Sequence, residues 1–345
     1  MASLIKRAPF SPFVTGAALY VLTRAPLDTR QAALQRLGQY LSPQNIGRLV
    51  GLLKWLFGIG VARNLNRYLN AWVRNGGRLR PSQKGWVWEK EIAVVTGGSS
   101  GFGALFTKGL AAKGINVVVL DINTLPADMQ SNPKITFFQC DVTSIESVKD
   151  VAKQVQETVG HPSILINNAG IGAITPIMET SPELLHKMFD INLLSHWWLL
   201  QTFLPAMIAA KKGHIVSIAS VASFISGPGM AHYSATKAGV MALHESLTVE
   251  LKGVHKCPEI KTTIVHPTFA DTPMVAPGKE MLQKKGMRLI DPQIVADAVV
   301  KQILSCRQGQ IILAGQHGIV AYLRALPSWF LALIQRRQAK WSDEA

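Results

Sequence analysis

Residues 96–103 read Thr96-Gly97-Gly98-Ser99-Ser100-Gly101-Phe102-Gly103, and this stretch decides the fold. It lies between an apolar segment that predicts a buried strand, Ile92–Thr96, and a segment that predicts a helix, Ala104–Lys113. Glycines here let the chain turn sharply and bring its backbone close to a pyrophosphate, which the N–H groups and dipole of the helix then stabilise. A glycine-rich turn without a ligand is the alternative explanation of this motif by itself.

The chain after Glu91 alternates segments of strand character with segments of helix length, which is typical of a parallel sheet covered by helices. One helix start is clear, because Asp291 suits the N-cap and Pro292 the first turn of a segment that runs to Leu304. We therefore predict a single α/β domain with a doubly wound, Rossmann-type parallel sheet of about seven strands. The expected strands are Ile92–Thr96, Asn116–Leu120, Ile135–Cys140, Ile164–Asn167, His214–Ala219, Lys261–Val265 and Gln310–Leu313.

Polar residues follow the predicted strands at their carboxyl ends, where doubly wound folds bind ligands. Asp121 follows the second strand about 20 residues after the glycines, where a carboxylate accepts hydrogen bonds from the adenosine ribose. It would repel a 2′-phosphate, and neither Ile122 nor Asn123 supplies a cation, so the sequence favours NAD, with NADP as the alternative. A purely structural aspartate at the strand end is the other interpretation. Further candidate cofactor-binding residues are Asp141, Val142, Asn168, Ala169 and Gly170.

Three residues form a candidate catalytic set after the fifth strand. Ser220 follows that strand, and Tyr233 and Lys237 lie four residues apart on the next helix, which places the phenol and the ammonium on one face. Each residue alone has a structural explanation, as a capping serine, a core tyrosine or a solvated lysine. Their joint occurrence after a nucleotide-binding turn favours a catalytic role.

Together these motifs resemble the short-chain dehydrogenase/reductase family. The resemblance runs from about Glu91 to Ala314 through the glycine motif, NNAG at 167–170, Asn192, Ser220 and YSATK at 233–237. It implies an oxidoreductase that transfers a hydride between a nicotinamide cofactor, NAD or NADP, and an alcohol or carbonyl.

The resemblance also implies roles for individual residues. Tyr233 would be the general acid/base, with the Lys237 cation and the oxidised nicotinamide favouring its phenolate. Lys237 would also hold the nicotinamide ribose, and Ser220 would stabilise charge on the substrate oxygen. Asn192 would hold a water that links Lys237 to solvent.

One stretch departs from the family pattern. Where Pro-Gly usually follows the sixth strand, this chain has Pro267-Thr268. Pro267, Ala270 and Thr272 still fit the stretch that contacts the carboxamide end of nicotinamide, whereas Thr268 leaves the local backbone conformation open.

Within the family the chain is similar to the membrane-bound branch of retinol dehydrogenases and lipid-droplet 17β-hydroxysteroid dehydrogenases. The similarity rests on LDIN at 120–123, FLPAM at 203–207, GHIV at 213–216, the basic N terminus and the tail around residues 330–337. It implies a hydrophobic small-molecule substrate, such as a retinoid, a sterol or another lipid. A non-catalytic NAD(H)-binding protein at a membrane surface is the rival interpretation, and a homodimer is one assembly that the sequence allows.

The basic residues concentrate in the first 88 residues. This segment holds 13 Lys/Arg and a single acid, a net charge of +12, whereas the remaining residues, with 23 basic and 20 acidic side chains, add only +3. Its apolar runs, Phe10–Leu22 and Ile46–Ala62, are interrupted or short for a span of about 20 residues, which favours attachment in the membrane interface. An arm packed on the enzyme is the alternative, and no nucleic-acid partner is expected because tryptophans and apolar runs accompany the cations.

The sequence thus divides into three predicted parts. Residues 1–88 form a membrane-associating helical segment that ends in a linker (Asn75-Gly76-Gly77, Pro81-Ser82), 89–316 form the catalytic domain, and 317–345 form a helical extension. We expect helix-turn-helix structure over Gly318–Ile334 and a substrate lid over Pro273–Ile290. The three cysteines have no paired spacing, which argues against a disulfide framework. The expected location is the cytosolic face of the endoplasmic reticulum or a lipid droplet.

Overall fold

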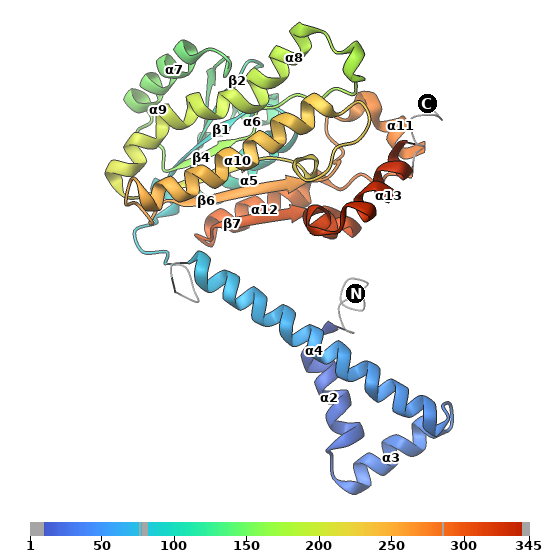
Figure 1. Cartoon of the computed structure of the whole chain (residues 1–345). Coiled ribbons are helices and arrows are strands. Elements are labelled where there is room, and N and C mark those ends of the chain that lie inside the picture. The colour runs from blue at the N-terminus through green and yellow to red at the C-terminus, as the bar shows by residue number, and fades with distance from the viewer. Residues whose placement is uncertain (1–9, 76, 78–81, 285, 340–345) are drawn as a thin grey trace. The chain divides into compact units, whose positions relative to one another are not determined.

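The computed structural model describes residues 10–75, 77, 82–284 and 286–339, and the chain divides into two compact units, residues 1–80 and 81–345. In the second unit, seven parallel strands form one sheet in the order β3-β2-β1-β4-β5-β6-β7 (Figure 1). This confirms the predicted doubly wound sheet, whose strand order reverses between β1 and β4. The strands are β1 (Ile92–Thr96), β2 (Asn116–Asp121), β3 (Ile135–Gln139), β4 (Ile164–Asn167), β5 (His214–Ile218), β6 (Lys261–Pro267) and β7 (Gly309–Leu313).

Helices cover both faces of this sheet, because most of its strands are apolar on both sides. The first layer contains α5 (Gly101–Ala111), α6 (Ala127–Gln130) and α12 (Pro292–Leu304), and the second contains α7 (Ile145–Thr158), α9 (Ser195–Ala210) and α10 (Ala231–Gly253). The predicted start of α12 is present, since the Asp291 carboxylate accepts a hydrogen bond from the Gln293 N–H at 2.8 Å.

Among the described residues, two helical stretches are long and apolar enough to cross a membrane by length and composition alone, Pro43–Arg74 and Pro182–Ala210. The second consists of α8 (Pro182–Phe189), the π-helical turn η4 (Asp190–Leu194) and α9. Its residues Leu199 and Phe203 are buried in the core beside the sheet, so this stretch belongs to the α/β fold.

The N-terminal unit consists of three helices, α2 (Pro12–Thr23), α3 (Leu27–Gly38) and α4 (Pro43–Arg74). α2 packs against α4, and the contact depends on Gly60, where a Cβ atom would lie 2.8 Å from the Phe10 carbonyl oxygen. Within its described residues only Thr15, Ala25 and Gly60 are buried, while apolar side chains such as Phe13 and Trp55 are 84% and 75% exposed. This unit therefore has almost no core of its own.

The segment before β1 belongs to the second unit. Trp86 and Trp88 stack with ring centroids 5.3 Å apart and pack against the sheet core. The predicted membrane-associating segment, residues 1–88, includes both tryptophans, but their apolar surface packs inside the α/β unit. Of the expected linker, Gly76 and Pro81 lie outside the described residues.

The C-terminal segment continues the second unit. A 3-10 helix, η7 (Gly315–Ala325), is followed by α13 (Ser328–Ala339), with Pro327 between them, much as the expected helix-turn-helix. The Arg324 Nε–H donates to the Phe224 carbonyl oxygen at 2.8 Å, and Leu323 is buried. The segment is thereby attached to the loop that follows β5.

Glu91 holds together the amino end of the sheet. Its carboxylate, 4% exposed, accepts from Lys212 Nζ at 2.6 Å, from Ser163 Oγ at 2.6 Å and from the Val87 N–H at 3.0 Å. The same Lys212 ammonium donates to the Gly85 carbonyl oxygen at 2.8 Å. A buried carboxylate with three donors is costly to replace, since removing it leaves its partners unpaired.

We expect Glu91→Ala to lower the free energy of unfolding by about 2–4 kcal/mol, because a largely buried ion pair and two further hydrogen bonds are lost. Thermal or urea unfolding of the full chain measures this. Asp128→Ala is the matched control, since its bond to Lys108 is exposed and should contribute less than about 1 kcal/mol. Equal losses for the two variants would contradict the assignment.

Candidate active site

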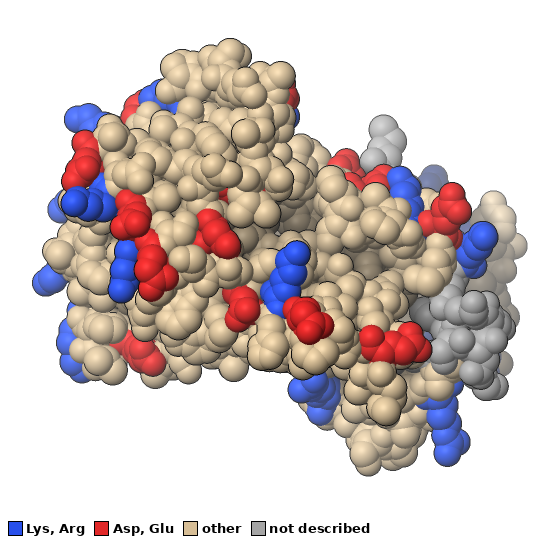
Figure 2. Space-filling model, turned by 90° about the horizontal axis from the view of Figure 1, so that it is seen from above, with Lys and Arg blue, Asp and Glu red and all other residues tan. Residues whose placement is uncertain are grey.

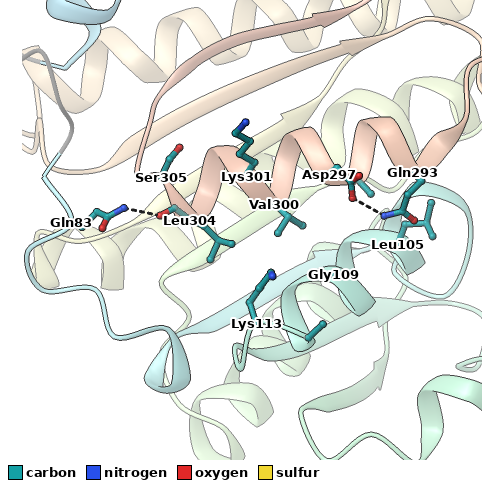
Figure 3. Close-up of a pocket in the computed structure, with 12 residues that line it drawn as sticks. Gln83, Leu105, Gly109, Lys113, Gln293, Asp297, Val300, Lys301, Leu304 and Ser305 are labelled. Atoms are coloured by element: carbon teal, nitrogen blue, oxygen red, sulfur yellow. Dashed lines mark hydrogen bonds between the residues drawn. The ribbon is translucent and has the colours of Figure 1, made fainter. Parts of the chain in front are cut away.

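The predicted site residues gather at the carboxyl edge of the sheet. They lie on the loops that follow β1 to β6, in the turn η4 and on the first turns of α10, around the point where the strand order reverses. Ligands of doubly wound folds bind at this point. A groove between α5 and α12, lined by Gly109, Asp297 and Lys301 among others, lies elsewhere and contains none of these residues (Figure 3).

The glycine turn has the conformation that its sequence predicts. Gly97 and Gly101 have positive φ angles of 63° and 52°, which side-chain-bearing residues rarely adopt. A Cβ atom on Gly103 would lie 2.0 Å from the Gly97 carbonyl oxygen, so only glycine allows α5 to begin directly against the turn. The glycine turn therefore leads directly into the first residues of α5.

The N terminus of α5 has no side-chain cap, and neither has that of α10. Ser144 caps α7, Ser181 caps α8 and Asp291 caps α12 with side-chain hydrogen bonds, whereas Ser100 at the N-cap of α5 makes none. The Ser100 side chain therefore accepts no hydrogen bond from the first-turn N–H groups of α5, such as that of Phe102. These donors suit a phosphate, and the residues present fit a dinucleotide.

Asp121 is buried and already engaged with the glycine turn. One carboxylate oxygen accepts from the Ser99 N–H at 2.9 Å and the other from the Asn123 N–H at 2.9 Å. Ser99 Oγ donates to the Asn123 carbonyl oxygen at 2.9 Å. The carboxylate thus joins the loops after β1 and β2 and keeps lone pairs available for a further donor.

Thr96 joins the loops after β1 and β4. Its Oγ1 accepts from the N–H groups of Asn168 and Ala169, both at 3.0 Å, and Asn168 Nδ2 donates to the Thr96 carbonyl at 2.9 Å. This role of Thr96 cannot be predicted from the sequence, because no local pattern indicates a partner 72 residues away. Asn168, expected to contact cofactor, uses its amide on the protein itself.

Asp141 and Val142 lie after β3 at the edge of the site. Val142 is buried, whereas Asp141 is exposed and accepts from Thr143 at 2.9 Å through the main-chain N–H and at 2.7 Å through Oγ1. Both residues lie at the predicted carboxyl edge.

The three candidate catalytic side chains are brought together. Tyr233 and Lys237 lie on the first two turns of α10, with Lys237 Nζ 5.8 Å from the centroid of the Tyr233 ring. Ser220 lies close enough to Tyr233 to lower the pKa of the phenol, and Ser220 Oγ donates to the Pro267 carbonyl oxygen at 3.4 Å. Lys237 is buried, and its Nζ donates to the Ile218 carbonyl oxygen at 3.0 Å, which holds α10 against the end of β5.

Burial dominates the electrostatics of this set. It raises the pKa of the Tyr233 phenol, and the neighbouring Ser220 hydroxyl opposes that shift only in part. Burial also lowers the pKa of Lys237 to about 8. Burial of Tyr233 therefore works against its phenolate. That the Lys237 cation and an oxidised nicotinamide together favour the phenolate stays a prediction about the cofactor-bound enzyme.

Asn192 lies in η4, a π-helical turn of a kind often found at functional sites. Its Oδ1 accepts from the Ile171 N–H at 2.8 Å and its Nδ2 donates to the Ile171 carbonyl at 2.9 Å. A Cβ atom on Gly170 would lie 3.2 Å from Asn192 Oδ1 and 3.6 Å from Lys237 Nζ. Glycine at 170 therefore lets Asn192 and Lys237 approach one another.

The stretch after β6 faces the glycine turn. A Cβ atom on Gly101 would have Thr272 as its nearest neighbour, at 3.9 Å. Ala270 is buried and forms a β-bridge with Ile290, which closes the expected lid segment at its base. Thr268 has a negative φ, and its N–H donates to the Leu313 carbonyl at 3.0 Å, so threonine is accommodated without strain after Pro267.

A doubly wound sheet with this turn and a Tyr–Lys pair facing it defines a class of dinucleotide-binding oxidoreductases. The family model described as short chain dehydrogenase matches residues 91–283. The chain belongs to this family and is an oxidoreductase, and membership indicates a nicotinamide cofactor.

Two relatives of known name and one solved structure resemble this chain. Retinol dehydrogenase 10-A of Xenopus laevis is 30% identical over 81% of this chain and 95% of its own length. Human estradiol 17-beta-dehydrogenase 11 is 31% identical over 72% of this chain and 83% of its own. A short-chain dehydrogenase from Streptomyces avermitilis has the same fold, with a TM-score of 0.60, 24% identity and coverage of 73% of this chain and 97% of that chain.

Proposed function

We propose that this protein oxidises or reduces a hydrophobic alcohol or carbonyl with NAD(H), using Ser220, Tyr233 and Lys237. The observation that carries the proposal is the meeting of these three side chains beside an uncapped, glycine-rich helix N terminus. A structural role for each residue separately does not explain why all of these features occur at one edge of the sheet.

The dinucleotide would lie along the carboxyl edge. Residues 97–103 would hold its pyrophosphate, Asp121 its adenosine ribose and Lys237 its nicotinamide ribose. Asp141, Val142 and residues 168–170 would line the intervening path, and Pro267, Ala270 and Thr272 would hold the carboxamide end. When bound, the cofactor supplies the hydride acceptor or donor.

The protein's own part is to move one proton and stabilise one oxygen. In reduction the protonated Tyr233 donates to the substrate oxygen, and in oxidation its phenolate accepts the alcohol proton. Ser220 Oγ donates a hydrogen bond to the same oxygen as its charge develops. Asn192 fixes the main chain of Ile171 beside Lys237 and so preserves the shape of this corner.

Exposed apolar residues around this corner support a hydrophobic substrate. Met178 is 95% exposed and Ile177 73% exposed on the loop after β4, and the neighbouring Ile174 lies beside the turn at Gly229 that precedes α10. Met274 on the loop after β6 approaches Gly172. Such a rim suits a lipid-like molecule, in keeping with relatives named for retinol and estradiol.

We expect Tyr233→Phe to fold and to bind NAD(H) but to lose about 10²–10⁴-fold in kcat, because the acid/base group is removed. A panel of retinoid, sterol and long-chain alcohols and carbonyls, monitored at the nicotinamide absorbance, measures this. A loss below about tenfold would remove Tyr233 from the role. Wild-type protein that binds NAD(H) but turns over none of the panel would favour the non-catalytic binding protein.

Asp121 supports NAD over NADP, because its carboxylate would repel a 2′-phosphate. Since Asp121 also holds Ser99 and Asn123, the cleaner test adds a cation next to it. Ile122 is 62% exposed, and we expect Ile122→Arg to raise kcat/KM for NADP(H) relative to NAD(H) by tenfold or so, about the effect of one added charge contact. Ile122→Gln controls for size, and a wild type that prefers NADP(H) would contradict the assignment.

We further propose that residues 1–80 attach the enzyme to a membrane surface and that 81–345 form the catalytic part. α4 carries Arg48, Lys54 and Arg63 among apolar residues, and Trp55 is exposed. By contrast, Lys/Arg and Asp/Glu are interspersed on the face seen in Figure 2. Cations beside exposed aromatic and aliphatic side chains suit an anionic lipid interface, on the cytosolic face of the endoplasmic reticulum or a lipid droplet.

We expect the full chain to float with anionic liposomes and a chain that begins at Ser82 to remain soluble. Salt should weaken flotation without abolishing it, since each cation adds about 1 kcal/mol while the apolar contribution is unscreened. Equal flotation of the two chains would refute the anchor. Aggregation of the shorter chain would instead favour an arm that covers the enzyme.

A further inference from the structure

A buried histidine lies directly behind Ser220. His266, on β6, has no exposed surface, and its Nδ1 is 3.0 Å from the Ser220 carbonyl oxygen. Its Nε2 is 3.0 Å from Gln310 Nε2 on β7, and its ring contacts that of Phe224 in a tilted arrangement, with centroids 4.5 Å apart and an interplanar angle of 40°. The ring thus connects Ser220, directly after β5, with Gln310, near the amino end of the parallel strand β7.

These contacts define which ring nitrogen carries the proton. A carbonyl oxygen can only accept, so Nδ1 must bear the hydrogen and donate to Ser220. Nε2 is then an acceptor, and the Gln310 amide nitrogen supplies the matching donor. A second proton, on Nε2, would place two donors, the ring N–H and the Gln310 amide N–H, against each other. Burial lowers the pKa of His266 to about 4, so the neutral form with this single tautomer persists at neutral pH.

The hydrogen bond acts on the main chain of Ser220, whose φ and ψ are −161° and 162°. The Ser220 carbonyl also accepts from the Ser223 N–H at 3.0 Å, and Ser220 Oγ accepts from the Ala222 N–H at 3.1 Å. Ser220 Oγ also donates a long hydrogen bond, 3.4 Å, to the Pro267 carbonyl oxygen on β6. His266, on the same strand, adds a side-chain donor that holds the Ser220 carbonyl. Its loss would let the carbonyl and, with it, the direction of Oγ shift.

We propose that His266, supported by Gln310, is a positioning residue that holds Ser220 for hydrogen bonding to the substrate oxygen. This inference rests on the proposed role of Ser220. Small displacements matter here, because an error of about 1 Å in a reacting group can cost about 10²-fold in rate. His266 does not touch the substrate and acts only through Ser220.

A purely structural role makes a different prediction, and the chain supplies a control for it. His214, at the amino end of β5, is also fully buried and makes one side-chain hydrogen bond, at 2.9 Å to Thr263 Oγ1. If a buried histidine only stabilises the sheet, His214→Leu and His266→Leu should both lower the unfolding temperature, and their effects on kcat should be equal.

The test is a double-mutant cycle in the full chain with saturating NAD(H) and the best alcohol of the panel. We expect His266→Leu to lower kcat by about tenfold or more, because a small displacement of a reacting group costs about that much in rate. The Kd of NAD(H) should change little. In a Ser220→Ala background the same substitution should change kcat by less than about twofold, because the group that it positions is gone. His266→Asn, whose amide nitrogen can replace Nδ1, should restore most of the rate.

Equal losses in both backgrounds, no recovery by His266→Asn, or an equal kcat loss for His214→Leu would each overturn the proposal. If His266→Leu does not fold, Gln310→Leu at an exposed position provides the same comparison, with a smaller loss expected only when Ser220 is present. A Ser220→Ala variant that keeps full activity would instead refute the proposed function, and the positioning role with it.

Discussion

The site depends on one close contact, that of Gly103 with the carbonyl of Gly97. A side chain at 103 would overlap this oxygen, so the absence of Cβ lets α5 start where the turn ends. The first-turn N–H groups then point to the same edge as the loops after β2 and β4, which Asp121 and Thr96 attach to the turn. The N terminus of α5 and the Asp121 carboxylate converge because this one approach is possible.

The sequence predicted the elements well wherever the signal was local. Seven strands, the start of α12 and the Tyr233–Lys237 pair follow from short-range patterns, namely apolar runs, N-cap chemistry and helical spacing. The limit of the N-terminal segment was harder to place. Trp86 and Trp88 continue its composition, yet their rings pack on the sheet, and composition alone does not distinguish a membrane-facing tryptophan from a core tryptophan.

What the sequence could not predict are contacts between distant polar groups and the effects of burial. Thr96 reaches Asn168 across the sheet, and His266 meets Ser220 and Gln310 only because β5, β6 and β7 are neighbours. The raised pKa of Tyr233 has the same origin, since desolvation depends on the packed structure rather than on the spacing to Lys237.

The pairing of β1 with β4 also constrains how the protein folds. The N–H groups of Asn168 and Ala169 that bond to Thr96 are synthesised some 70 residues after it, and a loop of that length must close before the nucleotide turn has its partner. Local helices can form earlier, but the centre of the sheet requires this non-local pairing, which slows folding. The glycine turn therefore lacks the partners that attach it to the centre of the sheet until β4 and the residues after it have been synthesised.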